Sequence, residues 1–302
     1  MTLIYSHPAA ARHQTPPGHP ERAERLNAVS AALSGLTVTH IASPMAQDSD
    51  LLLCHPARYL ARIKAAEPTS GTAQLDPDTW MSKGSYEAAS RAVGGACAAV
   101  DAVLNGQSRN AFVIARPPGH HAERETPMGF CLFGTVAIAA KHALLHVPRV
   151  AVVDFDVHHG NGTQDLLWHE PRALFATSQQ MPLWPGTGDR SERGAYHQIL
   201  NLPLPPGSDG KHMRAAYDAE IFPALTQWNP DLILISAGFD AHQDDPLAQL
   251  NWTAADYAWL THRLCDHAQG RVVSCLEGGY DLDALTASVA AHVGVLQERS
   301  NG

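Results

Sequence analysis

The chain has 302 residues, of which 45% are hydrophobic, an ordinary proportion for a globular protein. Its 21 Lys and Arg residues are outnumbered by 30 Asp and Glu, and the resulting net charge of −9 is scattered along the chain. These features argue against a nucleic-acid-binding surface, which needs clustered Lys and Arg, and against a membrane span, which needs about 20 consecutive apolar residues.

Short β-like segments alternate with longer Ala-rich segments of helical period from one end of the chain to the other. The expected strands are Leu3–Tyr5, Ala111–Ala115, Val150–Asp154, Leu174–Thr177, Leu232–Ser236 and Val272–Leu276. The expected helices are Glu21–Leu33, Ser85–Leu104, Val136–His146, Met213–Trp228, Ala254–Ala268 and Asp283–Leu296. This alternation predicts a parallel sheet with helices on both faces. Because no repeat or Ser/Gly linker divides the chain, we expect one domain over residues 1–302.

The N-terminus and the cysteines indicate the cellular compartment. No charged segment followed by an apolar one opens the chain, so we expect no secretory signal and a cytoplasmic location. The cysteines are odd in number and lack CxxC spacing, which favours reduced thiols over a disulfide framework or a thiolate zinc site. They are Cys54, Cys97, Cys131, Cys265 and Cys275.

The segment VAVVDFDVHHGNG, from Val150 to Gly162, concentrates polar side chains directly after a buried strand. Asp154, Asp156 and His158 lie at i, i+2 and i+4, so an extended chain would project them to one side. Two carboxylates and an imidazole in one buried place require a cation or a proton network. Open α/β sheets bind their ligands at the carboxyl ends of strands, where this row falls. The row therefore predicts a divalent metal.

Three other expected strands are also followed by polar loops. Ala111–Ala115 precedes RPPGHHA with His120 and His121, Leu232–Ser236 precedes AGFDAHQDDP with Asp240, and Val272–Leu276 precedes EGGYD with Tyr280. Parallel strands bring these loops to one edge of the sheet, which is the layout of an active site.

Asp156, His158 and Asp240 form a predicted metal site of two carboxylates and one imidazole. Such ligands suit Zn(II), with Fe(II) or Co(II) as alternatives, and leave a fourth position for water. Asp154 would then hold the ring of a neighbouring histidine. Any one of these aspartates could be an ordinary capping residue, and only the combination of loops favours a metal.

His120, His121 and Tyr280 are the candidate catalytic residues. The histidines could act as general base and acid beside water polarised by the metal, or could be loop histidines that bond to nearby backbone. The Tyr280 phenol could donate to an oxyanion, although a half-buried tyrosine at a helix start is the more ordinary interpretation. No GxSxG elbow or complete GxGxxG motif offers a serine hydrolase or dinucleotide alternative.

The motifs together resemble the metal-dependent histone deacetylase superfamily, which includes acetylpolyamine amidohydrolases and bacterial deacetylase-like amidohydrolases. The resemblance rests on RPPGHHA, MGFCLF, VVDFDVHHGNGTQ, PGTGD, SAGFDAHQDDPL and LEGGYD in this order, and extends to GHPERAERL and CHPARYL. It implies a three-layer α/β/α arginase/deacetylase-like fold with a central, mainly parallel, eight-stranded sheet. HHGN is similar to the class II pattern.

The resemblance implies a role for each matching residue. The residues that resemble the zinc ligands are Asp156, His158 and Asp240. His121 resembles the general base, which later acts as acid, and His120 resembles its electrostatic partner. Tyr280 resembles the tyrosine that donates to the oxyanion. Asp154 resembles the carboxylate behind His120. Asn161 stands behind His121 where some members have aspartate, and an amide there should leave His121 less basic.

The resemblance also implies a narrow tunnel for an acyl-lysine arm. The residues that match its wall, inner end and rim are Gly129, Phe130, Trp184, Gly278, Gly279 and Asp78. Ordinary core packing remains an alternative for Phe130 and Trp184. Potassium ions are typical of the family, and the backbone of Asp154, Asp156 and His158 with Thr177 could hold one. Gly134 and Gln179 depart from the family pattern, in which Asn and His are common.

The expected reaction is zinc-dependent hydrolysis of an N-acyl amide on a primary amine such as acetyl-lysine. Acetylpolyamine amidohydrolase is the alternative within the class, with Asp76, Asp78, Glu123 and Glu125 as candidate acidic residues for a second ammonium. A non-catalytic acyl-lysine binder is a remote alternative, because no expected catalytic residue is replaced. A ureohydrolase would need a second metal and more bridging aspartates. The sequence leaves the oligomeric state open.

Overall fold

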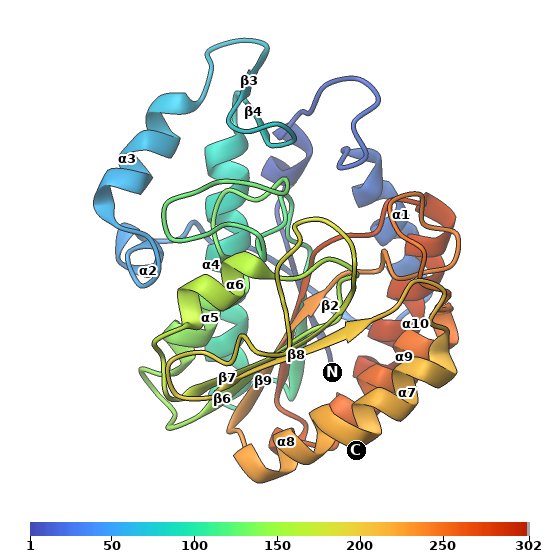
Figure 1. Ribbon diagram of the computed structural model, residues 1–302. Coiled ribbons are helices and arrows are strands. Elements are labelled where there is room, and N and C mark those ends of the chain that lie inside the picture. The colour runs from blue at the N-terminus through green and yellow to red at the C-terminus, as the bar shows by residue number, and fades with distance from the viewer. Residues whose placement is uncertain (301–302) are drawn as a thin grey trace.

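An eight-stranded parallel sheet forms the centre of the protein, which is described by a computed structural model covering residues 1–300 (Figure 1). The strand order is β2-β1-β5-β10-β9-β6-β7-β8, and every neighbouring pair is parallel. The strands are β1 (Leu3–Ser6), β2 (Thr39–Ala42), β5 (Asn110–Val113), β6 (Val150–Asp154), β7 (Ala173–Gln180), β8 (Ile199–Leu204), β9 (Leu232–Ala237) and β10 (Val272–Leu276). The predicted mainly parallel eight-stranded sheet is confirmed.

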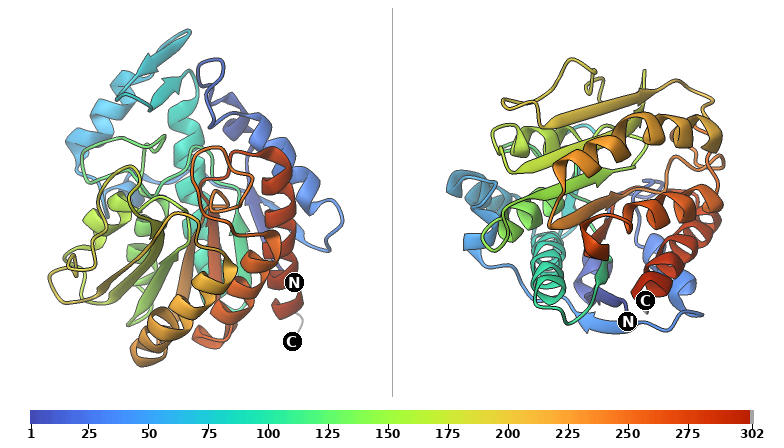
Figure 2. Two further views of the ribbon diagram at one scale, coloured as in Figure 1. Left: turned by 45° about the vertical axis from the view of Figure 1, so that its right-hand side comes forward. Right: turned by 90° about the horizontal axis from the view of Figure 1, so that it is seen from below.

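Helices cover both faces of the sheet, so the expected α/β/α layering is confirmed (Figures 1 and 2). One apolar core lies under α2 (Asp48–Leu51), α3 (Ala57–Ala66), α4 (Ser85–Leu104), α5 (Thr135–Ala143) and α6 (Asn161–Leu167). The other lies under α1 (Glu24–Leu33), α7 (Gly210–Ala216), α8 (Phe222–Trp228), α9 (Ala254–Leu264) and α10 (Leu282–Ser300). Among residues 1–300, no helix is both long enough and apolar enough to cross a membrane.

Several differences from the expected elements fall at the sheet edges and in short segments, and α3 was not expected either. The two outer strands, β2 and β8, were not expected: β2 alternates half-buried with exposed residues, and β8 contains Pro203. A small hairpin pairs β3 (Thr72–Gln74) with β4 (Trp80–Ser82). The expected helix Met213–Trp228 is divided by a π-helical turn, Tyr217–Ile221, between α7 and α8.

The strand order decides where the polar loops meet. After β6 the chain continues outward to β7 and β8, whereas after β9 it continues in the opposite direction to β10. β6 and β9 are hydrogen-bonded neighbours, with Asp154 opposite Ser236 at their carboxyl ends. A reversal of this kind opens a crevice beyond the strand ends, which is where α/β sheets bind ligands.

A buried ion cluster fixes the N-terminal segment against the loops at this edge. Glu21 Oε1 lies 2.7 Å from Arg116 Nε and 3.3 Å from Arg25 Nη1, and all three side chains are inaccessible to solvent. Arg25 also donates to the carbonyls of Gly279 and Glu277. Glu21 is therefore connected to the loops that carry His120 and Tyr280.

We expect Glu21→Gln to lower the free energy of unfolding by about 3–5 kcal/mol, because two buried guanidinium groups would lose their anionic partner. Burial by itself would raise the pKa of Glu21, but Arg116 and the hydrogen bond to His13 outweigh burial and hold it well below its ordinary value. The charged glutamate therefore contributes stability above the unfolded-state pKa of about 4.3, and this contribution is lost as the pH falls below that value.

Urea unfolding of both proteins from pH 7 to acid measures this difference. Glu125→Gln is the matched control, since Glu125 pairs with Arg58 at the surface and its loss should have little effect. A Glu21→Gln protein as stable as the parent at pH 7 would contradict the assignment.

Candidate active site

The polar row after β6 is a folded loop and not a continuation of the strand, which ends at Asp154. The Asp154 carboxylate accepts from the backbone N–H of Asp156 at 3.0 Å, and the Asp156 carboxylate accepts from that of His158 at 2.9 Å. Aspartate commonly forms this turn with the backbone two residues on. The expectation that an extended chain projects all three to one side is therefore corrected: the aspartates themselves set the local geometry.

Asp156, His158 and Asp240 converge at the β6–β9 crevice. His158 Nδ1 lies 3.1 Å from Asp156 Oδ1 and 3.1 Å from Asp240 Oδ2, and all three residues are buried. Burial by itself would lower the pKa of His158, but its hydrogen bonds to the two aspartates raise it to about 10. The pocket thus stabilises a positive charge between two carboxylates. This donor set fits a divalent metal held by one nitrogen and two oxygens.

Gly278 and Gly238 allow the backbone to approach these carboxylates. A Cβ atom on Gly278 would lie 2.3 Å from Asp240 Oδ2, and one on Gly238 would lie 2.0 Å from Asp156 Oδ2. The Gly278 N–H donates to Asp156 Oδ2 at 2.9 Å. Glycine is therefore required at both positions to orient the aspartates.

The tandem histidines have different partners. His120 Nδ1 lies 2.9 Å from Asp154 Oδ2. Although burial opposes protonation, the carboxylates of Asp156, Asp154 and Glu277 hold the pKa of His120 well above its ordinary value. Burial, followed by the nearby His120 and His158, holds the pKa of His121 well below its ordinary value. One ring is suited to carry a charge and the other to accept a proton.

Asn161 determines which nitrogen of His121 can accept that proton. Its Oδ1 lies 2.8 Å from His121 Nδ1, and its Nδ2 donates to Glu123 Oε1 at 2.9 Å. The Glu123 carboxylate can only accept a hydrogen bond, so the NH₂ of the Asn161 amide must face it. The amide oxygen of Asn161 then faces His121 and accepts from its Nδ1–H. His121 Nε2 then holds the free lone pair.

Tyr280 lies beside the predicted ligands as a protonated phenol. Burial, followed by the charge of Asp240, raises the pKa of Tyr280 well above its ordinary value. Its backbone N–H donates to Asp245 at 2.7 Å, and the Arg25 guanidinium lies 5.2 Å from the ring centroid. The phenol is therefore held as a hydrogen-bond donor.

A cavity of about 180 Å³ leads to this centre. It is lined by Asp78, His121, Gly129, Phe130, His158, Leu183, Trp184, Leu247 and Tyr280. Gly278 and Gly279 are not among these residues: Gly278 lies against Asp156 and Asp240, and a Cβ on Gly279 would approach Leu285 and Phe239. Their place at the inner end of the tunnel stays a prediction.

Phe130 and Trp184, two aromatic residues of the cavity, are not buried core residues. Trp184 is 42% exposed, and its ring lies 4.7 Å from that of His121. The ring of Phe130 lies 5.9 Å from Tyr280, and Phe130 has a left-handed φ of 68° directly after Gly129. Gln179, at a departure from the family pattern, donates to the carbonyl of Gly188 at 2.7 Å in the loop that follows Trp184.

Several residues that contact this centre were not singled out in the sequence. They are Arg25, Asp245, Glu277, Leu183 and Leu247. Glu277 accepts from the backbone N–H groups of Gly119 and His120, and burial raises its pKa to about 7. Glu277 and Asp245 lie within EGGYD and HQDDP, two of the motifs that follow strands, so the sequence already placed them near the predicted site. Arg25 likewise lies within GHPERAERL, but its bond to Gly279, 254 residues away, depends on the tertiary structure.

The fold and the site have clear counterparts among known proteins. The structure matches the crystal structure of the HDA15 HD domain with a TM-score of 0.94 and 30% identity, over 98% of this chain and 90% of that one. This places it in the arginase/deacetylase-like class of α/β folds. The histone deacetylase domain family matches residues 19–296.

Two relatives span most of this chain. An uncharacterized Synechocystis protein, slr0245, is 46% identical over 96% of this chain and 97% of its own length. The histone deacetylase-like amidohydrolase of Pseudomonas aeruginosa is 39% identical over 90% of this chain and 74% of its own length. The protein belongs to the histone deacetylase family.

Proposed function

We propose that the protein is a zinc-dependent deacetylase that hydrolyses the N-acyl amide of a primary amine such as acetyl-lysine. The observation that carries this proposal is a cavity lined by His121, Tyr280 and His158, the last of which belongs to the three-residue group that could hold a metal. Asp156, His158 and Asp240 would hold the Zn(II) ion, for which Fe(II) or Co(II) could substitute. A potassium ion at the backbone of Asp154, Asp156, His158 and Thr177 is part of the same proposal.

The residues divide the chemistry among them. When bound, the metal supplies Lewis-acid polarisation of water and of the substrate carbonyl. His121 accepts the proton of the attacking water through Nε2, since its other nitrogen donates to Asn161. Tyr280 donates its hydroxyl proton in a hydrogen bond to the carbonyl oxygen as negative charge develops there. The histidine pair then protonates the leaving amine, with Asp154 stabilising the charge on His120.

The residues that line the cavity suit a lysine arm with its methylene chain. Trp184 and Phe130 present aromatic surface to the methylene chain, and Asp78 is the carboxylate that faces the cavity. The other acidic candidates have different partners: Asp76 accepts from the N–H groups of Asp78 and Thr79, Glu125 pairs with Arg58, and Glu123 bonds to Asn161. Asp78 could bind a peptide N–H or, in the acetylpolyamine alternative, a second ammonium.

A substrate panel tests the proposal. We expect an acetyl-lysine peptide to be hydrolysed with a higher kcat/KM than acetylputrescine or acetylspermidine, and all turnover to stop on chelation. Asp78→Asn should raise KM for the peptide with kcat retained, because rim binding contributes equally to ground and transition states. Glu125→Gln is the matched control outside the cavity. A preference for acetylpolyamines would establish the alternative, and no turnover of any acyl amine by the metal-loaded protein would overturn the proposal.

A further inference from the structure

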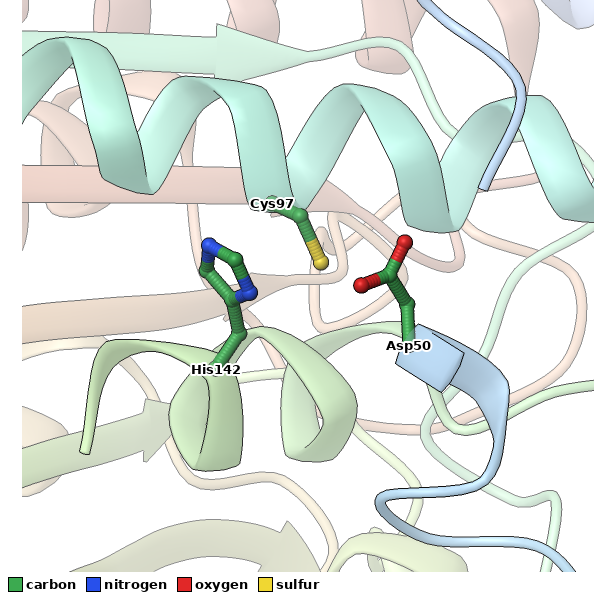
Figure 3. A group of neighbouring side chains, drawn as sticks. All are labelled: Asp50, Cys97 and His142. Atoms are coloured by element: carbon green, nitrogen blue, oxygen red, sulfur yellow. The ribbon is translucent and has the colours of Figure 1, made fainter. Parts of the chain in front are cut away.

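A second convergence of metal-binding side chains lies away from the crevice, among the helices of one face. Asp50 on α2, Cys97 on α4 and His142 on α5 point toward one another (Figure 3), and their ligand atoms all lie within 4.8 Å of one another. Cys97 is buried, whereas Asp50 and His142 are partly exposed. An ion could therefore reach the cluster from solvent.

The histidine of this cluster is already oriented as a ligand. Its Nε2 lies 2.8 Å from Asp101 Oδ1, and Figure 3 shows the other ring nitrogen turned toward Cys97. A carboxylate that accepts the Nε2–H fixes the tautomer and leaves a lone pair on Nδ1. Metal-bound histidines usually have such an outer carboxylate. The pair Asp101–His142 thus supplies the outer partner that a metal site requires.

The other two side chains also have donor atoms to spare. Asp50 uses Oδ2 to accept from the Gln47 N–H at the start of α2, which leaves Oδ1 for another partner. Burial, followed by the charges of Asp50 and Asp101, raises the pKa of the Cys97 thiol. These two carboxylates disfavour a thiolate unless a cation is present. A divalent ion would offset their charge and deprotonate the thiol on binding.

We propose that Asp50, Cys97 and His142 form a second divalent-metal site that takes a thiophilic ion of the Zn(II) or Co(II) class. Thiolate, imidazole and carboxylate are accepted zinc ligands, and a water would complete the tetrahedron. Metal–ligand distances of about 2.0–2.3 Å require the donor atoms to close by about 1 Å, which rotation of the partly exposed Asp50 side chain allows. The ion would join α2 to α4 and α5, which the Asp101–His142 contact already connects.

Cobalt absorption distinguishes this site from the active centre, whose ligands are all oxygen and nitrogen. Titration of the reduced, metal-stripped full chain with Co(II) alone should give a near-ultraviolet thiolate-to-cobalt charge-transfer band that saturates at one equivalent. Total cobalt should reach two equivalents per chain. Cys97→Ala and Asp50→Asn should each abolish the band and lower the bound cobalt by one equivalent per chain. Asp240→Asn should keep the band.

Two further variants complete the test. Cys54→Ala removes another buried thiol and should leave the band unchanged. Asp101, His142 and His146 form an overlapping group that contains no sulfur. If the second equivalent of cobalt gave no charge-transfer band and was lost in His146→Ala, this group would be the metal site and the proposal would be overturned. The absence of a band in the parent protein, or a band retained in both Cys97→Ala and Asp50→Asn, would overturn it equally. Because Asp50 is partly exposed, its variant stays informative if Cys97→Ala fails to fold.

Discussion

The Asp240→Asn protein is expected to lose the metal of the active centre and, with it, at least about 10³-fold in kcat. The amide has nearly the shape of the carboxylate but no charge, so His158 and Asp156 would remain as a two-ligand site with a single negative charge. Metal polarisation is worth several kcal/mol, and about 4 kcal/mol corresponds to 10³-fold in rate.

Metal analysis, kinetics and thermal unfolding together check this result. The metal content should fall by one equivalent per chain while the variant still unfolds cooperatively. Chelation of the parent protein should remove activity in the same way, and addition of Zn(II) should restore it to the parent but not to the variant. Chelator-resistant turnover, or an Asp240→Asn protein with full activity, would contradict the assigned centre.

Tyr280→Phe is expected to lower kcat by about 10²–10³-fold, the usual cost of removing one oxyanion donor. Phenylalanine keeps the ring that contacts Phe130 and lies under Arg25, so KM and metal content should change little. The loss would come from the transition state alone, because the hydroxyl bonds most strongly to an oxygen that carries negative charge.

Steady-state kinetics on an acetyl-lysine peptide measure this effect. Tyr196→Phe is the matched control, since Tyr196 is 57% exposed and outside the cavity. If the Tyr280→Phe enzyme were as fast as the parent, the phenol would have no part in the chemistry, and stabilisation of the oxyanion would have to come from elsewhere.

Elements with a strong local signal were predicted closely. Ser85–Leu104 and Val150–Asp154 have the expected bounds, because a long Ala-rich helix and a run of β-branched residues are each defined by their own side chains. The edge strands β2 and β8 were missed, since each pairs on one side only and their sequences alternate weakly or contain proline. Helix α3 was also missed, although Pro56 and the spacing of Tyr59, Leu60 and Ile63 mark it.

For the site, the sequence by itself determined which chemical groups are present and that they follow strands. Asp156, His158, Asp240, His121 and Tyr280 each occupy a loop directly after a strand, and parallel strands end at a common edge. That reasoning needs no distances between elements. It is enough to place the predicted ligands and the candidate catalytic groups at one edge of the sheet.

Only the tertiary structure decided the contacts that orient these groups. Glu123 turns the Asn161 amide, Asp245 holds the Tyr280 backbone, and Arg25 joins the loops of Gly279 and Glu277. The Asp50–Cys97–His142 cluster likewise gathers one residue from each of three helices. Such contacts depend on strand order and helix packing, because residues tens or hundreds of positions apart become neighbours only after the apolar faces have been buried. The spacing of residues within one segment therefore does not predict these contacts.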